Sequence, residues 1–169
     1  MYALAPLQQG LFYHWLSSPE DSVYFIQMSY RLSGDLDVGL LKDSYVQLVD
    51  RYSVLRTVFS DELSDIGLQI VRKRGVADFS YVEVPFGSDA GSFIREYKSS
   101  DIRRGFDLLS QSPMRLSILK AGESEYEFIW SMHHILMDGW CLGILIGELL
   151  HIYNALKNGL SPRLKPVHA

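Results

Sequence analysis

The chain has 169 residues, a hydrophobic fraction of 47% and a net charge of −4, values typical of one compact domain with a single substantial core. Its Lys and Arg residues are not clustered, apart from the short run Arg72-Lys73-Arg74 that fits a solvated turn, so the charge pattern argues against a nucleic-acid-binding surface. A single cysteine, Cys141, excludes an internal disulfide and a zinc site built on a cysteine pair.

These features predict a soluble protein of the cytoplasm. We expect no signal peptide, because the N-terminus lacks a basic segment followed by an apolar run. The longest apolar stretch, Trp140 to Leu150, contains glycines and is expected to be too short to span a bilayer.

Helical and strand patterns alternate along the first half of the chain. Pro6 opens a helix that runs to Leu16, and Tyr24 to Leu32 are β-prone. Asp37 is the expected cap of a second helix. The apolar stripe of that helix consists of Leu40, Leu41, Tyr45, Leu48 and Val49. Two paired strands, Val54 to Phe59 and Leu68 to Val71, are predicted around a turn at residues 64–67.

The second half of the sequence predicts a helix, a hairpin and a final helix. The first helix covers Ser92 to Arg103. The hairpin joins Met114 to Leu119 with Tyr126 to His133 across Lys120 to Glu123. A long apolar helix then begins just past Gly139, with its core positions at Leu142, Leu145, Ile146, Leu149, Leu150 and Tyr153. The order of the strands in a sheet cannot be derived from these patterns.

The last predicted strand ends at two adjacent histidines. Its period of two places His134 on one face with Tyr126, Phe128, Trp130 and Met132, and places His133 on the other with Glu127, Ile129 and Ser131. The two rings therefore diverge, and we expect one to be chemical and the other structural. His134 precedes the loop, which makes it the better candidate for a base at the mouth of a cleft. A histidine suits that role because its ordinary pKa of about 6.5 leaves a neutral fraction at cellular pH.

Asp138 and Gly139 follow the histidines closely. The Asp138 carboxylate is expected either to orient an imidazole or to pair with an arginine and hold the loop. Arg56 and Arg115 are the candidate partners within this chain. Gly139 would let the backbone approach a substrate and leave its amide N–H free to donate.

Other interpretations of the same residues stay open. A pair of histidines at a strand end is often structural. His133, His134 and Asp138 are also a donor set that suits iron, although the diverging rings and the lack of a third suitably spaced histidine favour no metal. Cys141 has no evident activating partner and is expected to be a small buried hydrophobe.

Several segments resemble one known family. Met132 to Trp140 resembles the His-His-x-x-x-Asp-Gly signature of condensation domains of nonribosomal peptide synthetases. Arg51 to Phe59 is similar to the family's Arg-His-x-x-Leu-Arg-Thr-x-Phe segment, with Tyr52 in place of the usual histidine. Leu4 to His14 resembles the opening helix of these domains. Arg104 to Leu108 and Pro113 to Arg115 resemble the family's Phe-Asp-Leu-x-x-x-Pro-x-Arg stretch.

The resemblance implies a fold and a reaction. It implies an α/β fold (an α+β sandwich) like that of chloramphenicol acetyltransferase, with a mixed sheet flanked by helices. Residues 1–169 would form the N-terminal lobe, with the C-terminal lobe absent. In the complete domain, upstream and downstream carrier-protein domains deliver phosphopantetheine thioesters, and the acceptor amine attacks the donor thioester to form an amide. An adenylation domain in cis is a further implied partner, and no directly bound cofactor is implied.

The resemblance also assigns roles to single residues. His134 matches the second histidine of the signature, which would act as a base or position the amine, and His133 matches the first. Asp138 matches an aspartate with a structural, loop-holding role, whose arginine partner is Arg56, Arg115 or an arginine in the absent lobe. Gly139 and Trp140 are expected to line the substrate site.

Two alternatives of the same fold remain, an epimerization domain and a noncatalytic domain that docks a protein partner. Pro6 to Gly10 looks more like an ordinary condensation domain that takes an L-configured donor than like an epimerization domain. The signature is intact, whereas noncatalytic relatives tend to have a degraded one. Because the cleft needs a facing lobe, we expect the isolated chain to be folded but inactive.

Overall fold

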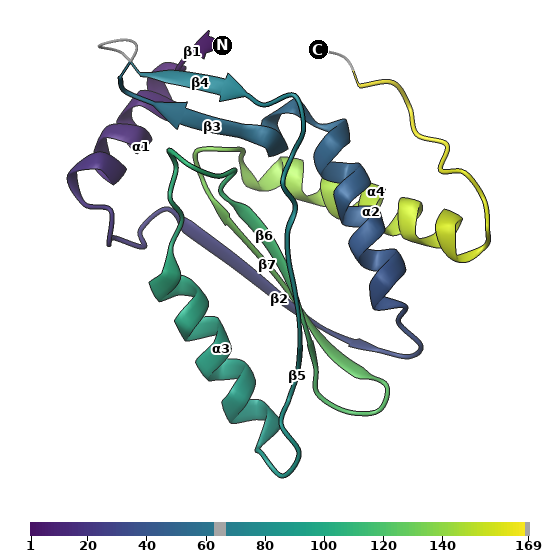
Figure 1. The fold of residues 1–169 in the computed structure, drawn as a ribbon. Helices are drawn as coiled ribbons and strands as arrows, with labels where there is room; N and C mark the ends of the chain where they lie inside the picture. Colours follow the sequence, from purple (N-terminus) through teal and green to yellow (C-terminus); the bar gives the residue numbers. More distant parts are fainter. Residues whose placement is uncertain (63–66, 168–169) are drawn as a thin grey trace.

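A computed structural model describes residues 1–62 and 67–167 (Figure 1). Strands and helices alternate along the chain, as the sequence predicts for an α/β fold. The elements in chain order are β1 (Tyr2–Ala3), α1 (Pro6–Ser17), β2 (Phe25–Ser33), α2 (Val38–Arg51), a 3-10 helix (Ser53–Arg56), β3 (Thr57–Ser60), β4 (Leu68–Val71), β5 (Asp78–Glu83), α3 (Ala90–Arg104), β6 (Met114–Lys120), β7 (Glu125–His133) and α4 (Gly139–Lys157).

The strands form two sheets. The larger has four strands in the order β2-β7-β6-β5, in which β5 runs parallel to β6 and the other neighbours are antiparallel. The expected mixed sheet is therefore confirmed. The smaller sheet has the order β1-β4-β3 and lies beyond one end of the larger one (Figure 1).

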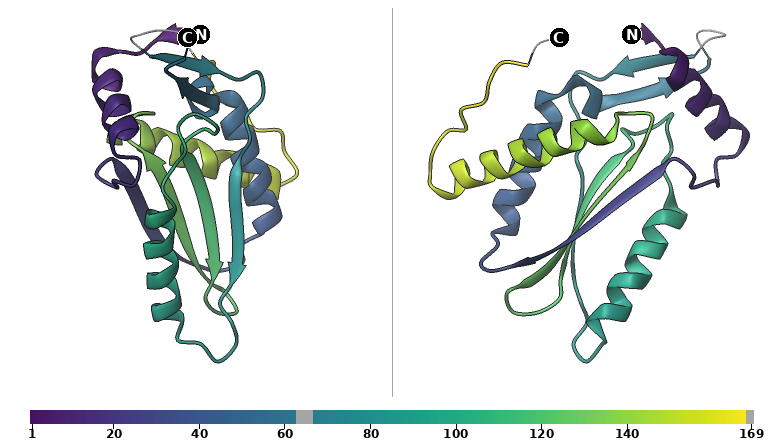
Figure 2. Two further views of the ribbon diagram at one scale, coloured as in Figure 1. Left: turned by 60° about the vertical axis from the view of Figure 1, so that its left-hand side comes forward. Right: turned by 180° about the vertical axis from the view of Figure 1, so that it is seen from behind.

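Helices cover both faces of the larger sheet. Figure 2 shows α3 on the side opposite α2 and α4. Trp130 on β7 is fully buried in the main core beneath α2 and α4, whereas Ile129 packs in a smaller cluster with Ile94 of α3 and Leu119. This alternation confirms the two faces predicted for the last strand.

Three aspartates begin the longer helices as side-chain caps. Asp37 accepts from the Leu40 N–H at 2.9 Å and Asp89 accepts from the Ser92 N–H at 2.7 Å. Asp138 caps α4 in the same way. Each carboxylate satisfies a backbone donor that has no partner within the helix. The cap at Asp37 was predicted, and those at Asp89 and Asp138 were not.

One local prediction needs correction, and one strand was missed. The strand expected over Val54 to Phe59 is wrong in its first half, because residues 53–56 form a 3-10 helix closed by the Thr57 Oγ1 bond to the Ser53 carbonyl. Only β3, from Thr57, pairs with β4. Most of the turn predicted between these strands, residues 64–66, lies outside the described residues. The parallel strand β5 had no recognised local signal.

Helix α4 is longer than the predicted apolar stretch. It has 19 residues, and by length and composition alone it is apolar enough to cross a membrane. Only 28% of its most apolar window is buried within the described structure. The expectation that the apolar segment is too short to span a bilayer is therefore wrong, because it considered only Trp140 to Leu150 and the helix continues to Lys157.

Candidate functional site

The two histidines separate at the end of β7. The strand ends at His133, which is buried, while His134 begins the turn that leads to α4 and is exposed. The prediction that the two rings diverge is confirmed. His134 lies just past the strand, however, so it does not continue the face of Tyr126 and Trp130 as expected.

His133 is held as a neutral ring. Its Nδ1 accepts from the Ile135 N–H at 3.2 Å, which leaves the ring proton on Nε2. Burial, with smaller contributions from His134 and His14, lowers the pKa of His133 to about 4. The ring lies 6.1 Å from that of Tyr24 and lines a cavity of about 230 Å³ that also contacts Phe25 and Phe106. This environment fits the structural member of the pair.

His134 has the opposite arrangement. Its Nδ1 lies 2.9 Å from the Met137 carbonyl oxygen, and a carbonyl can only accept, so the proton is assigned to Nδ1. The neutral ring then carries its lone pair on Nε2, on the opposite edge. An exposed imidazole with a free Nε2 lone pair can accept a hydrogen bond or a proton from a substrate.

Backbone bonds to distant elements hold the histidine turn. The His134 N–H donates to the Tyr24 carbonyl at 2.9 Å, and the His133 N–H donates to the Pro113 carbonyl at 3.0 Å. Gln8 on α1 donates through Nε2 to the Ile135 carbonyl at 3.2 Å. The sequence analysis assigned no role to Gln8 or Tyr24. The one feature that could have pointed to Gln8 is its place in the segment Leu4 to His14, which resembles the opening helix of the family. The position of His134 therefore depends on α1 and β2 as well as on β7.

Asp138 holds the loop as a helix cap. Its Oδ1 accepts from the Trp140 N–H at 3.1 Å and the Cys141 N–H at 3.2 Å. The bond from Cys141 is the main reason that the pKa of Asp138 is lowered, and His134 also contributes. Asp138 is exposed, so it needs no buried counter-ion.

The expected pairing of Asp138 with Arg56 or Arg115 is wrong within the described residues. Arg115 is 1% exposed and pairs with Asp101 of α3. Its Nη2 also donates to the Asp101 and Gly105 carbonyls at 2.8 and 2.9 Å. Arg56 instead donates to the Arg72 carbonyl. Arg56 therefore holds the 3-10 helix against the segment after β4 and does not reach the histidine loop.

The first turn of α4 is open to solvent. An added Cβ on Gly139 would meet no atom within 4 Å, and the Trp140 side chain is 88% exposed. Both positions are therefore accessible from solvent. Cys141 is also exposed, so the expectation that it is buried is wrong. The helix turns Leu142, and not Cys141, toward the core.

The donor set for a metal does not assemble. Within residues 1–62 and 67–167, no three His, Cys, Asp or Glu side chains gather as metal ligands. His133 is turned inward with Nδ1 occupied by the Ile135 N–H. The iron-binding interpretation of His133, His134 and Asp138 therefore has no geometric support.

Comparisons with known proteins agree on one family. The family model described as "Condensation domain" matches residues 1–169. The chain is 38% identical over 169 residues to surfactin synthase subunit 3 of Bacillus subtilis (strain 168), covering 99% of the chain and 13% of the relative. It is 40% identical over the same length to tyrocidine synthase 2 of Brevibacillus parabrevis, covering 5% of that protein.

Solved structures share the fold. The starter condensation domain of rhizomide synthetase matches with a TM-score of 0.88 and 20% identity, covering 97% of this chain and 40% of that one. The first condensation domain of the calcium-dependent antibiotic synthetase matches with a TM-score of 0.87 and 15% identity, over the same shares. The chain thus spans less than half of these domains and a small part of its curated relatives. Its whole length matches the family model, and it belongs to the condensation-domain family of nonribosomal peptide synthetases.

Proposed function

We propose that this chain is the N-terminal lobe of a condensation domain that joins a donor acyl or peptidyl thioester to an acceptor aminoacyl thioester. The observation that carries the proposal is the His134 ring, exposed at the end of β7 with Nδ1 bound to the Met137 carbonyl and Nε2 free. The family membership of the chain supports the same reaction class.

The proposed reaction needs only a positioned acceptor for one proton. The acceptor nitrogen attacks the donor carbonyl carbon, the carbon–nitrogen bond forms and the carbon–sulfur bond breaks. The proton lost by the nitrogen passes through His134 Nε2 to the leaving thiolate. Positioned acid–base catalysis of this kind contributes roughly 10²- to 10⁴-fold to a rate. Alignment of the amine alone would also accelerate the reaction, because an activated thioester and a neutral amine react readily when held together.

The other site residues have supporting roles in this proposal. Asp138 fixes the start of α4 through its cap, and so fixes the loop that carries His134. Gly139 leaves room for the thioester beside the ring, and Trp140 offers an exposed apolar surface to the substrate. His133, a buried neutral ring, supports the turn that carries His134.

The proposal extends to partners that lie outside this chain. We assign the substrates to phosphopantetheine arms of upstream and downstream carrier-protein domains, with an adenylation domain in the same polypeptide and a C-terminal lobe that completes the cleft. Support comes from the large synthetases to which the chain is similar. We also place the parent enzyme in the cytoplasm, in keeping with a sequence that has one cysteine.

Two other functions compete with this proposal. An epimerization domain would use the same loop for proton exchange at the α-carbon of a bound aminoacyl thioester. A noncatalytic domain would only dock a partner. The free Nε2 of His134 favours a catalytic role over docking, and the assay below separates the two reactions.

The test uses the parent condensation domain, loaded donor and acceptor carrier proteins and deuterated water. We expect the dipeptidyl product on the acceptor carrier, with no deuterium at the α-carbon. Deuterium at the α-carbon without amide formation would establish the epimerization alternative, and no change in either carrier would establish docking. The chain of 169 residues alone should give no product, since it has no facing lobe; rapid amide formation by it would contradict the lobe assignment.

A further inference from the structure

The turn between β7 and α4 sets the tautomer of His134 through a carbonyl of its own backbone. The Met137 carbonyl oxygen lies 2.9 Å from His134 Nδ1 and so favours the tautomer with the proton on Nδ1. That carbonyl is three residues beyond the ring, so its direction depends on the path of the turn. A group that fixes the path of residues 135–137 therefore acts on the His134 ring.

The buried end of β7 fixes the beginning of this turn. The Ile135 N–H donates to His133 Nδ1 and the Leu136 N–H donates to the His133 carbonyl, both at 3.2 Å. The side chains of Ile135, Leu136 and Met137 are buried in the main core. These contacts hold N–H groups and side chains of the turn, whereas the Ile135 carbonyl is bound from α1.

Gln8 on α1 holds the Ile135 carbonyl with one end of its amide and the start of its own helix with the other. Its Nε2 donates to the Ile135 carbonyl at 3.2 Å, while its Oε1 accepts from the Ala5 N–H at 3.1 Å. The bond from Ala5 is the type that the third residue of a helix makes in a capping box, and it restrains rotation of the amide. Both groups of the Gln8 amide are therefore used, and Nε2 is directed at the turn.

Helix α1 is a firm base for this contact. Leu11 and Phe12 are buried in the main core, and Trp15 Nε1 donates to the Phe106 carbonyl at 3.0 Å. A polar group on a helix that is fixed in this way holds a site residue more precisely than one on a loop. Gln8 thus connects a fixed helix to the turn that carries His134.

We propose that Gln8 is a positioning residue for the reaction. Its amide fixes the Ile135 carbonyl, and through the turn it keeps the Met137 carbonyl on His134 Nδ1, so that Nε2 carries the lone pair. The inference rests on the proposed function, in which His134 Nε2 takes the proton from the acceptor amine. A misplacement of about 1 Å at a reacting group can lower a rate by about 10²-fold, so loss of the bond from Gln8 should be measurable.

Gln8→Glu separates the two bonds of the amide. A carboxylate still accepts from the Ala5 N–H, and a negative charge in the first turn of α1 suits the helix dipole, so α1 should stay folded. The carboxylate cannot donate to the Ile135 carbonyl and repels it. We expect the single-turnover rate of amide formation in the parent domain to fall roughly 10- to 100-fold. Gln8→Met, which removes the donor without adding a charge, should be slowed as well.

The tautomer of His134 is a readout that a general loss of stability would not change. In the parent domain with ¹⁵N-labelled histidine, protonated and bare ring nitrogens give well-separated NMR signals, and the spectrum of His134→Ala identifies those of His134. At alkaline pH, where histidine rings are neutral, the wild type should carry its proton on Nδ1. In Gln8→Glu we expect a larger share of rings with the proton on Nε2.

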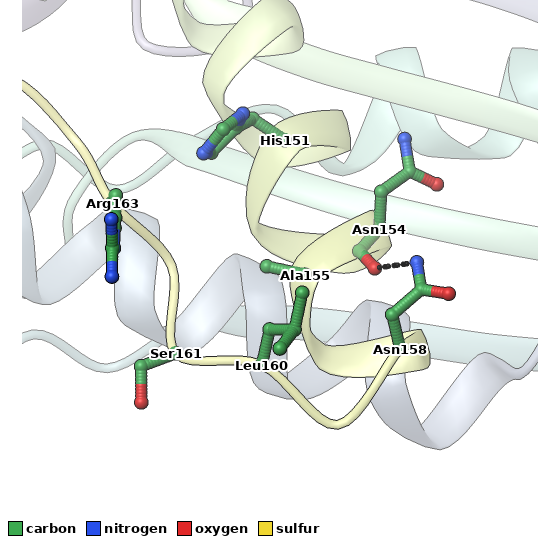
Figure 3. Close-up of a pocket in the computed structure, with 7 residues that line it drawn as sticks. All are labelled: His151, Asn154, Ala155, Asn158, Leu160, Ser161 and Arg163. Carbon is green, nitrogen blue, oxygen red and sulfur yellow. Dashed lines mark hydrogen bonds between the residues drawn. The ribbon is translucent and has the colours of Figure 1, made fainter.

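Two control variants make the same exchange of amide for carboxylate away from the turn. Gln9 is next to Gln8 and also half-buried, and its Nε2 donates to the Leu4 carbonyl at 3.0 Å. At the far end of α4, beside a cavity of about 650 Å³, Asn158 Nδ2 donates to the Asn154 carbonyl at 2.7 Å (Figure 3). Gln9→Glu and Asn158→Asp each lose such a bond, and both should keep the wild-type rate and the wild-type tautomer.

A wild-type tautomer in Gln8→Glu would overturn the inference, and so would a wild-type rate. Equal slowing of Gln8→Glu and Gln9→Glu would also overturn it, because α1 as a whole would then be responsible. If the wild-type domain itself forms no amide, the proposed function fails, while the tautomer comparison still decides whether Gln8 sets the His134 ring.

Discussion

The two histidines differ in what surrounds them, although they are neighbours in sequence. His133 is buried with its Nδ1 occupied by a backbone N–H, while His134 is exposed with its Nδ1 bound to a carbonyl. The arrangement of His133 places its ring proton on Nε2, and that of His134 leaves a lone pair on Nε2. Nδ1 accepts a hydrogen bond in His133 and donates one in His134, so the two neutral rings are different tautomers and only His134 has a free lone pair on Nε2.

The lowered pKa of His133 predicts a dependence of stability on pH. Its folded-state pKa of about 4 lies below the unfolded value of about 6.5, so between these values the unfolded chain binds the proton more readily. The contribution to stability is complete above pH 6.5 and is lost as the pH falls to 4, in total about 3 kcal/mol.

Urea unfolding of the parent domain at several pH values tests this prediction. The free energy of unfolding of His133→Asn, which does not titrate in this range, should fall less steeply between pH 6.5 and 4 than that of the wild type. Parallel curves for the two proteins would show that His133 is not a buried neutral ring.

Asp138 predicts a modest effect on stability. Asp138→Ala removes the acceptor of two N–H groups at the start of α4 and should lower the melting temperature by a few degrees. Asp138→Asn keeps an oxygen that can cap and should recover most of the loss. If Asp138→Asn melts as low as Asp138→Ala in calorimetry, the charge itself matters and an arginine outside this chain becomes the better explanation.

At the scale of elements, a buried polar network joins α3 to the larger sheet, in addition to the apolar cluster of Ile94, Leu119 and Ile129. Arg115 of β6 binds Asp101 of α3, and Asp101 also accepts from Ser131 of β7 and from Gln27 of β2 at 2.9 Å. The Arg115 guanidinium lies 4.3 Å from the centre of the Phe106 ring. One buried carboxylate thus joins three strands and a helix.

Removal of the arginine should be costly. Arg115→Met leaves the buried Asp101 carboxylate without its ion-pair partner and should lower the free energy of unfolding by about 3 to 5 kcal/mol, measured in urea. Adding Asp101→Asn to that variant removes the unpaired charge and should restore part of the stability. If Arg115→Met alone is as stable as the wild type, the Arg115–Asp101 pair contributes nothing to the stability of the fold.

Local patterns predicted most of these elements, and nonlocal contacts account for the errors. Helices α1 to α4 and the β6–β7 hairpin follow from periodicity and turn residues. The parallel pairing of β5 with β6 has no local signal. Neither does the Arg115–Asp101 pair, since nothing in the sequence shows which acid the arginine meets. The cap at Asp138 had a signal, an aspartate just before an apolar helix, but the sequence analysis considered only the orientation of an imidazole or a pair with an arginine.

At the scale of the molecule, the site is assembled from distant parts of the chain. The turn that carries His134 is bound to Gln8 of α1, Tyr24 and Pro113. The place of His134 just before the loop favoured it over His133 as the chemical histidine, but the sequence alone could not place α1 against the turn that carries it.

The most direct test of the role of His134 is the single-turnover rate of amide formation in the parent domain with loaded carrier proteins. His134→Ala should lower this rate by roughly 10²- to 10⁴-fold. Because the ring is exposed, the melting temperature should change little. Val76→Ala, at an exposed side chain distant in sequence from the loop, serves as the control and should turn over normally. Wild-type turnover by His134→Ala, in a domain that melts normally, would contradict the assignment of this ring to the reaction.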